Sequence, residues 1–327
     1  MRFITLNLIT VFLLLAFSMS QSMAQGFPSK TIRLIIPYGA GGPADVMARF
    51  FSREMTAILG QAMIVENIPG ASSTVGMATC ANAIPDGHTI CLTVPDSLSY
   101  NPLLYRNLPY KPTGSFAPVI QLTRANAIIV ANASAPFSTL KEMLEYAKQN
   151  PGKLNFGTWG PATLPDVYRQ WFEKKGEVNI VGIPYKSAAA AMNAVLGNEI
   201  NLTFITLGFA LPHIRSGKIK PIVVTGSMRA AAAQDIPSLG ELGFDPGLGS
   251  YFGVFAPFAT SPSIIAQLNS AFAKVLSTPA TQQFLRAQTM EPVGASPESF
   301  TAYVQRDQTS ATGLFQFLGI QPTASPE

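Results

Sequence analysis

The feature that most constrains this chain is a glycine-rich loop between a predicted strand and a predicted helix. The apolar run Ile32–Ile36 stops at Pro37, and Pro43 stands where a helix would have its first residue. Three glycines precede Pro43 and leave bare backbone N–H groups near the helix start. Such donors, together with the helix dipole, attract anions. We therefore expect an anion-binding loop here, the first glycine-rich loop (residues 38–42).

The N-terminus has the features of a secretory signal peptide. Arg2 is followed by the apolar stretch Leu8–Phe17 and by small residues at Ser22 and Ala24. We expect residues 1–24 to be removed after export. A membrane anchor needs roughly 18 or more apolar residues, and no later stretch of the sequence has that character.

Composition limits the partners. About 300 residues follow the leader, which suits two α/β domains better than one core. The chain has 22 lysine and arginine residues against 18 aspartate and glutamate residues, without a basic run. Nucleic acid is therefore not an expected partner.

The two cysteines stand close together in the sequence. Cys80 falls late in a predicted helix and Cys91 in the predicted strand 89–94, so the side chains could meet. In an exported protein we expect a structural disulfide, with two buried free thiols as the alternative. His88 and His213 are well separated, so we expect no metal site of the usual zinc spacing.

Strands and helices alternate after the leader, which predicts parallel sheets with ligand loops at the strand carboxyl ends. A second glycine-rich loop (residues 67–76) and a third (residues 157–165) each follow a predicted strand. A second alternation of strands and helices begins at Ala127. Three helical patterns follow at the C-terminus, and we expect these helices to cover the first sheet. We expect residues 25–123 with 250–327 to form a discontinuous first domain and residues 124–249 the second.

Two further segments carry structural expectations. Residues 101–118 are dense in proline and aromatic residues, and we expect them to wrap the surface. The tail after Gly319 is polar and contains proline, and we expect it to fray.

A dinucleotide-binding enzyme is the weaker alternative. Gly39–Ala44 fits the pattern G-x-G-x-x-A, and Glu66 ends the next strand, where a ribose-binding acid would fall. Against this, Pro37 and Tyr38 separate the glycines from the strand, nicotinamide cofactors are scarce outside the cytoplasm, and no proton-transfer group is evident. We expect no cofactor and no catalytic residue.

An ordered set of segments over nearly the whole exported chain resembles the extracytoplasmic solute receptors of tripartite tricarboxylate transporters, the Bug family. The segments are KTIRLIIPY (30–38), GGPADVMAR (41–49), VENIPGA (65–71), PDG (85–87), NLPY (107–110), FAPV (116–119), PGKLN (151–155), PYK (184–186), LPHIRSGK (211–218) and EPVG (291–294).

The resemblance implies a periplasmic binding protein of type II-like fold, with two α/β domains around a ligand cleft joined by two crossing segments. Such receptors close on a small carboxylate and deliver it to a membrane permease. The resemblance also implies a non-enzymatic protein, which we expect to be a monomer. An exported ligand sensor for a two-component system is the alternative.

In this family the carboxylate is held largely by backbone N–H groups and bridging waters of the first two loops. The first domain is thus expected to contribute Tyr38, Gly39, Ala40, Gly41, Gly42, Asp45, Ala71, Ser72 and Ser73, with Thr93 and Asp96 near the cleft. The second is expected to contribute Thr158, Trp159, Gly160, Thr163, Tyr185 and Thr206.

Three departures from the family pattern concern the ligand. Gly39 and Ala40 replace bulkier residues of the first loop, and the third loop carries Trp159 with two prolines instead of several serines and a histidine. Trp159 suits either stacking on an aromatic acid or domain packing. Thr206 stands where an acidic residue is common, which disfavours an amino acid ligand. Dicarboxylates, tricarboxylates, aromatic acids and nicotinate-like acids remain open.

Overall fold

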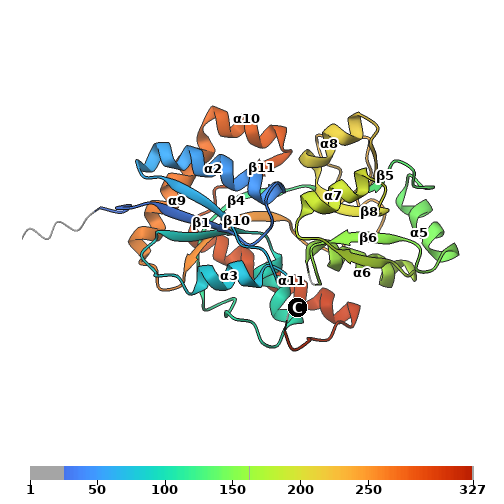
Figure 1. Cartoon of the computed structure of the whole chain (residues 1–327), viewed down its shortest axis with the longest axis horizontal. Coiled ribbons are helices and arrows are strands. Elements are labelled where there is room, and N and C mark those ends of the chain that lie inside the picture. The colour runs from blue at the N-terminus through green and yellow to red at the C-terminus, as the bar shows by residue number, and fades with distance from the viewer. Residues whose placement is uncertain (1–25, 162, 326–327) are drawn as a thin grey trace, which may run out of the picture.

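Two β-sheets, each covered by helices, form the two halves of the molecule (Figure 1). They are seen in a computed structural model that describes residues 26–161 and 163–325. The predicted signal peptide, residues 1–24, lies outside the described residues. The architecture is the predicted one: two α/β halves, each built on one sheet, joined by two crossing segments.

The first sheet has six strands in the order β11-β4-β10-β3-β1-β2. β1 is parallel to β2 and β3, whereas β10 runs antiparallel to β3 and β4. The bounds are β1 (Ile32–Ile36), β2 (Met63–Asn67), β3 (Thr89–Thr93), β4 (Phe116–Ala125), β10 (Tyr251–Pro257) and β11 (Met290–Pro292).

Helices cover both faces of this sheet, which explains why β1 is a continuous apolar run. Leu34 and Ile36 pack in a cluster with α2 and α9, while Ile35 packs with α3 and α11. The bounds are α2 (Pro43–Leu59), α3 (Thr74–Ala81), the π-helical turn η1 (Asp96–Tyr100), α4 (Asn101–Leu104), α9 (Pro262–Ser277), α10 (Pro279–Ala287) and α11 (Pro297–Leu318).

The second sheet has five strands in the order β7-β6-β8-β5-β9. Its members are β5 (Ala127–Asn132), β6 (Asn155–Thr158), β7 (Val181–Pro184), β8 (Leu202–Thr206) and β9 (Ile219–Val224). α5 (Leu140–Gln149), α6 (Leu164–Gly176), α7 (Ala188–Leu196) and α8 (Leu207–Arg215) accompany it. β6 is parallel to β7 and β8, so the loops after these strands meet at one edge.

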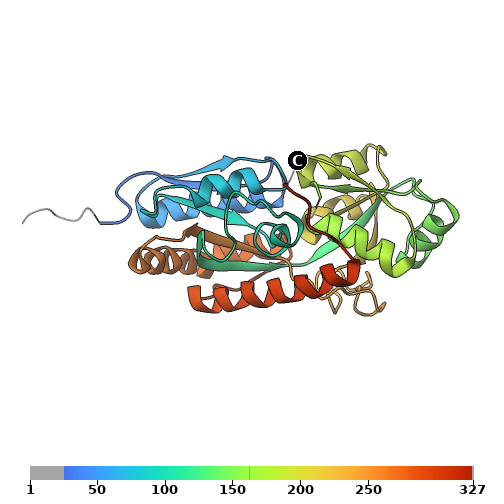
Figure 2. The same ribbon diagram turned by 90° about the horizontal axis from the view of Figure 1, so that it is seen from below.

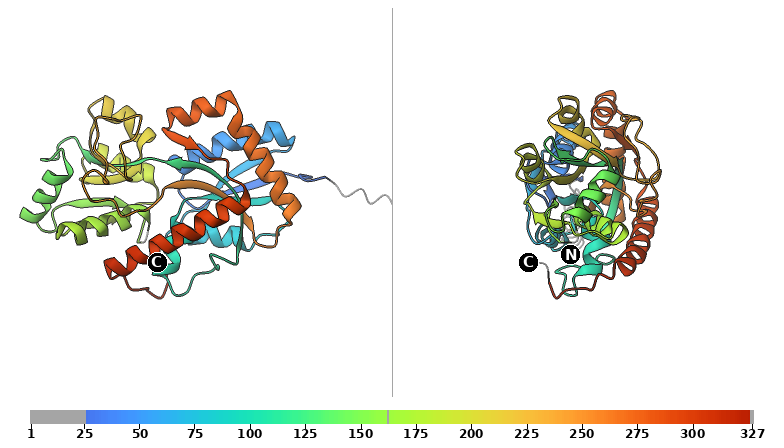
Figure 3. Two further views of the ribbon diagram at one scale, coloured as in Figure 1. Left: turned by 180° about the vertical axis from the view of Figure 1, so that it is seen from behind. Right: turned by 90° about the vertical axis from the view of Figure 1, so that its right-hand side faces the viewer.

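The chain crosses between the sheets twice. Asn126 alone separates β4 from β5, and residues 225–250 lead from β9 back to β10. Figure 3 shows these connections running between the two halves from behind. β10 then pairs with β3 on one side and β4 on the other, so a late segment lies in the middle of a sheet begun by the first strands.

Two expectations about irregular segments are corrected. Residues 101–118 lie on the surface only in part, because Leu104, Tyr105 and Tyr110 are buried while Arg106, Asn107 and Lys111 are exposed. The tail is tied down, because the Thr323 N–H donates to Leu104 O at 2.7 Å and Thr323 O accepts from the Arg106 N–H at 2.9 Å. Figure 2 shows this last segment, in dark red, crossing the molecule after α11.

Candidate functional site

A cavity of about 40 Å³ lies where the two domains meet. That volume has room for a few water molecules. Its lining consists of Tyr38, Gly39, Gly42, Pro43, Ala44, Val94, Trp159, Leu164, Ala188, Phe204, Thr206, Ser250 and Phe252.

Four helices begin at this cavity. The first residues of α2, α6 and α7 are Pro43, Leu164 and Ala188, all in the lining, and Thr206 is the N-cap of α8. The N-caps of α2, α6 and α8 make no side-chain hydrogen bond to their own helix. The start of a helix carries partial positive charge, so four helix starts at one cavity favour an anion there.

The first glycine-rich loop packs directly on the start of α7. The Gly39 N–H donates to Lys186 O at 3.3 Å. A Cβ atom at position 39 would lie 2.9 Å from that oxygen, which only glycine avoids. A Cβ at Gly42 would lie 3.7 Å from the Ala188 Cβ, an ordinary contact. The loop thus forms one wall and touches the opposite domain.

Asp45 stabilises this loop through a hydrogen bond to its backbone. Its Oδ2 accepts from the Gly41 N–H and from the Arg49 Nε, both at 3.0 Å. Burial raises the pKa of Asp45, but the hydrogen bonds from Arg49 and Gly41 outweigh it and bring the pKa below its ordinary value. The carboxylate is therefore engaged by the protein, and Asp45 is not part of the cavity lining.

Glu66, the acid of the dinucleotide alternative, is paired as well. The Arg33 guanidinium donates to both its oxygens, at 2.7 and 2.8 Å. Such a two-point pair occupies the carboxylate that would otherwise bind a ribose.

The second glycine-rich loop has an unusual backbone that turns its hydroxyls toward protein groups. Ala71, Ser72 and Ser73 have φ angles of 43°, 51° and 74°, in the left-handed region that L-residues rarely adopt. The Ser72 hydroxyl donates to Pro161 O in the other domain at 2.8 Å. The Ser73 hydroxyl is 2.8 Å from that of Ser97 in its own domain.

Thr93 and Asp96 lie behind the cavity, fully buried. Thr93 Oγ1 is 3.4 Å from the Tyr38 hydroxyl and 2.8 Å from that of Ser97. Asp96 Oδ1 accepts from the Leu164 N–H at 2.9 Å. Burial raises the pKa of Asp96 to about 7. Asp96 thus joins a first-domain turn to a second-domain helix.

The third glycine-rich loop supplies Trp159. Its ring meets Tyr38 and Phe204 edge to face, each at 6.2 Å between centroids. The Thr163 hydroxyl donates to Gly160 O at 2.8 Å and holds the loop in shape.

The predicted site residues divide into two sets. Tyr38, Gly39, Gly42, Trp159 and Thr206 line the cavity. The remainder stand outside the lining, in or beside the loops around it: Ala40, Gly41, Asp45, Ala71, Ser72, Ser73, Thr93, Asp96, Thr158, Gly160, Thr163 and Tyr185. Thr158 borders a separate surface hollow.

Several lining residues were not predicted, although a signal existed for two of them. Phe204 precedes Thr206 by two strand positions and so shares its face. Ala188 opens a helix after a strand and a short loop, the same pattern as the first loop. The place of four others in the lining depends on how the two domains meet, which no local pattern indicates: Val94, Leu164, Ser250 and Phe252.

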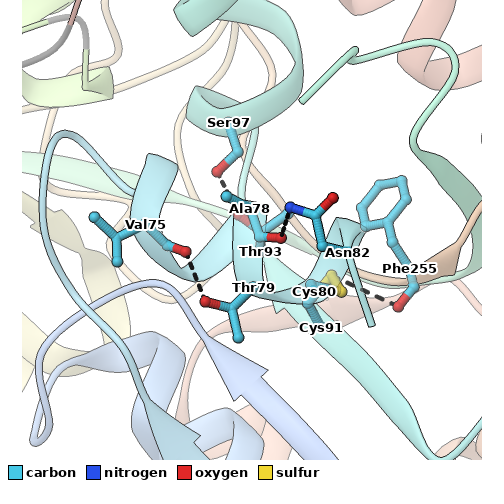
Figure 4. Close-up of a disulfide and its surroundings, with 9 residues drawn as sticks. All are labelled: Val75, Ala78, Thr79, Cys80, Asn82, Cys91, Thr93, Ser97 and Phe255. Carbon is cyan, nitrogen blue, oxygen red and sulfur yellow. Dashed lines mark hydrogen bonds between the residues drawn. A yellow bond between two sulfur atoms is a disulfide. The ribbon is translucent and has the colours of Figure 1, made fainter. Parts of the chain in front are cut away.

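The Cys80–Cys91 disulfide ties α3 to β3 (Figure 4). The two Cα atoms are 6.1 Å apart, and both residues are fully buried. The Cys91 sulfur lies 3.7 Å from Phe255 O, on the central strand β10.

The described residues contain neither a metal-binding cluster nor a membrane-spanning helix. No cluster of three or more histidine, cysteine, aspartate or glutamate residues there is arranged to hold a metal ion. Nor does any described helix combine the length and apolarity needed to cross a membrane.

The fold and the interdomain cavity define the class of two-domain solute-binding proteins. Residues 47–320 match the family described as the tripartite tricarboxylate transporter family receptor. The chain belongs to this family, as the resemblance predicted.

Relatives and solved structures agree with that placement. The chain is 34% identical to a UPF0065 protein of Bordetella pertussis over 315 residues, 96% of each chain. It superposes on the periplasmic binding protein BugD with a TM-score of 0.86 at 30% identity, covering 91% of this chain and 100% of that one. Rpa4515 of R. palustris with adipate gives 0.86 at 27% identity, with coverage of 91% and 100%.

Proposed function

We propose that this protein is a periplasmic solute receptor that captures a small carboxylate between its domains and delivers it to the permease of a tripartite tricarboxylate transporter. The family and the adipate complex of a relative support a carboxylate. The observation that carries the proposal is the meeting of four helix starts at one cavity.

Backbone dipoles supply the positive potential in this proposal. None of the lining residues is lysine, arginine, histidine, aspartate or glutamate. A carboxylate here is held by N–H groups at the helix starts. This electrostatic attraction is strongest where water is excluded.

Contacts across the cavity explain how binding favours closure. Ser72 bonds to Pro161, Asp96 to Leu164 and Gly39 to Lys186, each pair joining the two domains. A ligand that touches α2 on one side and α7 on the other binds the closed arrangement better and shifts the population toward it. The permease then distinguishes loaded from empty receptor by shape.

A charge placed at Gly42 tests the proposal. Gly42 has φ −84° and ψ 174°, so an L-residue fits, and aspartate or asparagine there would cap α2 equally well. Gly42→Asp adds a negative charge at the helix start, whereas Gly42→Asn is its neutral match. We expect both variants to fold and Gly42→Asp to bind carboxylates at least tenfold more weakly than Gly42→Asn.

The ligands are found first by thermal shift with adipate, malate, citrate, hexanoate and 4-hydroxybenzoate, and affinities then come from calorimetry. A ligand at 100 times its dissociation constant stabilises the folded protein by about 2.7 kcal/mol. Equal affinities of the aspartate and asparagine variants would contradict an anion held at α2.

A further inference from the structure

Two polar atoms at the cavity are buried without a partner. Trp159 Nε1 and Thr206 Oγ1 make no hydrogen bond to any described residue, although both side chains belong to the lining. Thr206 is only 7% exposed. Buried polar groups are almost always paired, so each such atom calls for a physical explanation.

The position of Thr206 makes its free hydroxyl unusual. Threonine at an N-cap normally accepts a hydrogen bond from its own helix. Here Thr206 is the N-cap of α8 and makes no such bond. Its hydroxyl therefore remains available to a molecule in the cavity.

Trp159 is held firmly, which limits how its N–H can be satisfied. Its ring sits between Tyr38 and Phe204 in edge-to-face contacts. An indole N–H can only donate. Leaving a donor buried and unpaired costs about 1 to 3 kcal/mol, so a ligand that offers an acceptor removes this cost.

The rest of the lining is largely apolar. Val94, Leu164, Phe204 and Phe252 contribute hydrocarbon surface. The Tyr38 hydroxyl lies 3.4 Å from Thr93 Oγ1. No lining carboxylate is present to balance a ligand ammonium group.

We propose that Trp159 and Thr206 are specificity residues that recognise a second oxygen acceptor on the ligand. The cargo class is a carboxylic acid whose apolar chain or ring carries a hydroxyl, carbonyl or carboxylate oxygen, without an ammonium group. The carboxylate meets the helix starts, and the second oxygen accepts from Trp159 Nε1 and pairs with the Thr206 hydroxyl. This inference rests on the proposed function.

Matched pairs of acids test the inference by calorimetry. Adipate and hexanoate differ at the end of a chain, and 4-hydroxybenzoate and 4-methylbenzoate differ at one ring position. We expect the wild-type protein to prefer the oxygen-bearing member of a pair by at least tenfold. Trp159→Phe and Thr206→Val should each weaken binding of the oxygen-bearing acid at least fivefold. The affinity for its apolar counterpart should stay within twofold of the wild-type value.

Trp171→Phe is the control, because Trp171 Nε1 already donates to Phe244 O at 2.6 Å outside the cavity. This variant should bind all four acids as the wild type does. Equal wild-type affinity for both members of each pair would overturn the inference, as would Trp159→Phe weakening both members equally. If none of the four acids binds and none in the thermal-shift panel stabilises the protein, the proposed function itself fails.

Fluorescence gives an independent readout. The chain has two tryptophans, so Trp171→Phe leaves Trp159 as the only indole. A hydrogen bond from its N–H lowers the energy of the excited indole, and we expect adipate to shift its emission to longer wavelength. A saturating amount of adipate that leaves the emission maximum unchanged would overturn the contact.

Discussion

Asp96 accepts a hydrogen bond from the Leu164 N–H at 2.9 Å, so a carboxyl group of the first domain caps a helix of the second. Thr163 is the N-cap of α6, but its hydroxyl donates to Gly160 O instead of serving its own helix. The N–H of Leu164, the first of α6, is therefore paired with a residue of the other domain. The contact between the domains and the capping of α6 form together.

Burial of Asp96 predicts a loss of stability as the pH rises. Burial raises the pKa of Asp96 to about 7 and that of Asp307 to about 6, against about 3.9 for an unfolded aspartate. Between these values the folded state holds more protons than the unfolded state. The free energy of unfolding therefore falls as the pH rises from about 4 to 7, by up to about 1.4 kcal/mol per pH unit and group.

We expect urea unfolding at pH 5, 6, 7 and 8 to show this decline in the wild type and a flatter profile in Asp96→Asn. Asp307→Asn is the matched variant and should keep the part of the decline between pH 6 and 7. An Asp96→Asn profile parallel to that of the wild type would refute the assignment to Asp96.

The adjacent serines of the second loop should respond differently to the loss of their hydroxyls. Ser72→Ala removes a bond to the opposite domain, to Pro161 O, whereas Ser73→Ala removes one to Ser97 within the same domain. A hydrogen bond contributes about 1 kcal/mol. We expect Ser72→Ala to weaken carboxylate binding about fivefold, and Ser73→Ala to lower the free energy of unfolding while affinity stays within twofold.

Both variants change a serine with left-handed φ to alanine, so backbone effects are matched. Calorimetry and urea unfolding on the same samples separate the two results. Indistinguishable affinities for the two variants would argue against a role of Ser72 in closure.

Removal of the disulfide should cost stability without changing the cavity. Cys80 and Cys91 are separated by 11 positions, and closing a loop of this size is worth about 3 kcal/mol. We expect Cys80→Ala with Cys91→Ala to lower the free energy of unfolding by about 2 to 3 kcal/mol and to leave carboxylate affinity within twofold.

Reduced wild-type protein is the control, because it keeps both sulfur atoms in the core. Its free energy of unfolding should fall by a similar amount, measured by urea unfolding with and without reductant. If reduction leaves the unfolding midpoint unchanged, the bond contributes nothing to stability.

Local signals in the sequence predicted most of the architecture. The apolar run of β1, the prolines and serines at helix starts and the alternation of strands and helices each depend on a few neighbouring residues. They were enough to predict two α/β domains with glycine-rich loops at the strand ends. Ser261 and Ser296, for example, accept from the third residue of their helices.

Contacts between distant segments could not be predicted in this way. The bond of Ser72 to Pro161 depends on the domains closing, and the burial of Tyr105 depends on residues of both domains around it. Likewise, a pattern can show that Trp159 follows a strand, but not that its N–H lacks a partner. The cavity is thus the part of the fold that local patterns describe least.

The central place of β10 also sets an order of events during biosynthesis. A chain that emerges from its N-terminus cannot join β3 to β4 until residue 257 is free, because these strands meet only through β10. The five strands of the second sheet, in contrast, all lie between residues 127 and 224. The second domain can therefore fold before the strands of the first sheet are all joined. The C-terminal helices then pack on the first sheet.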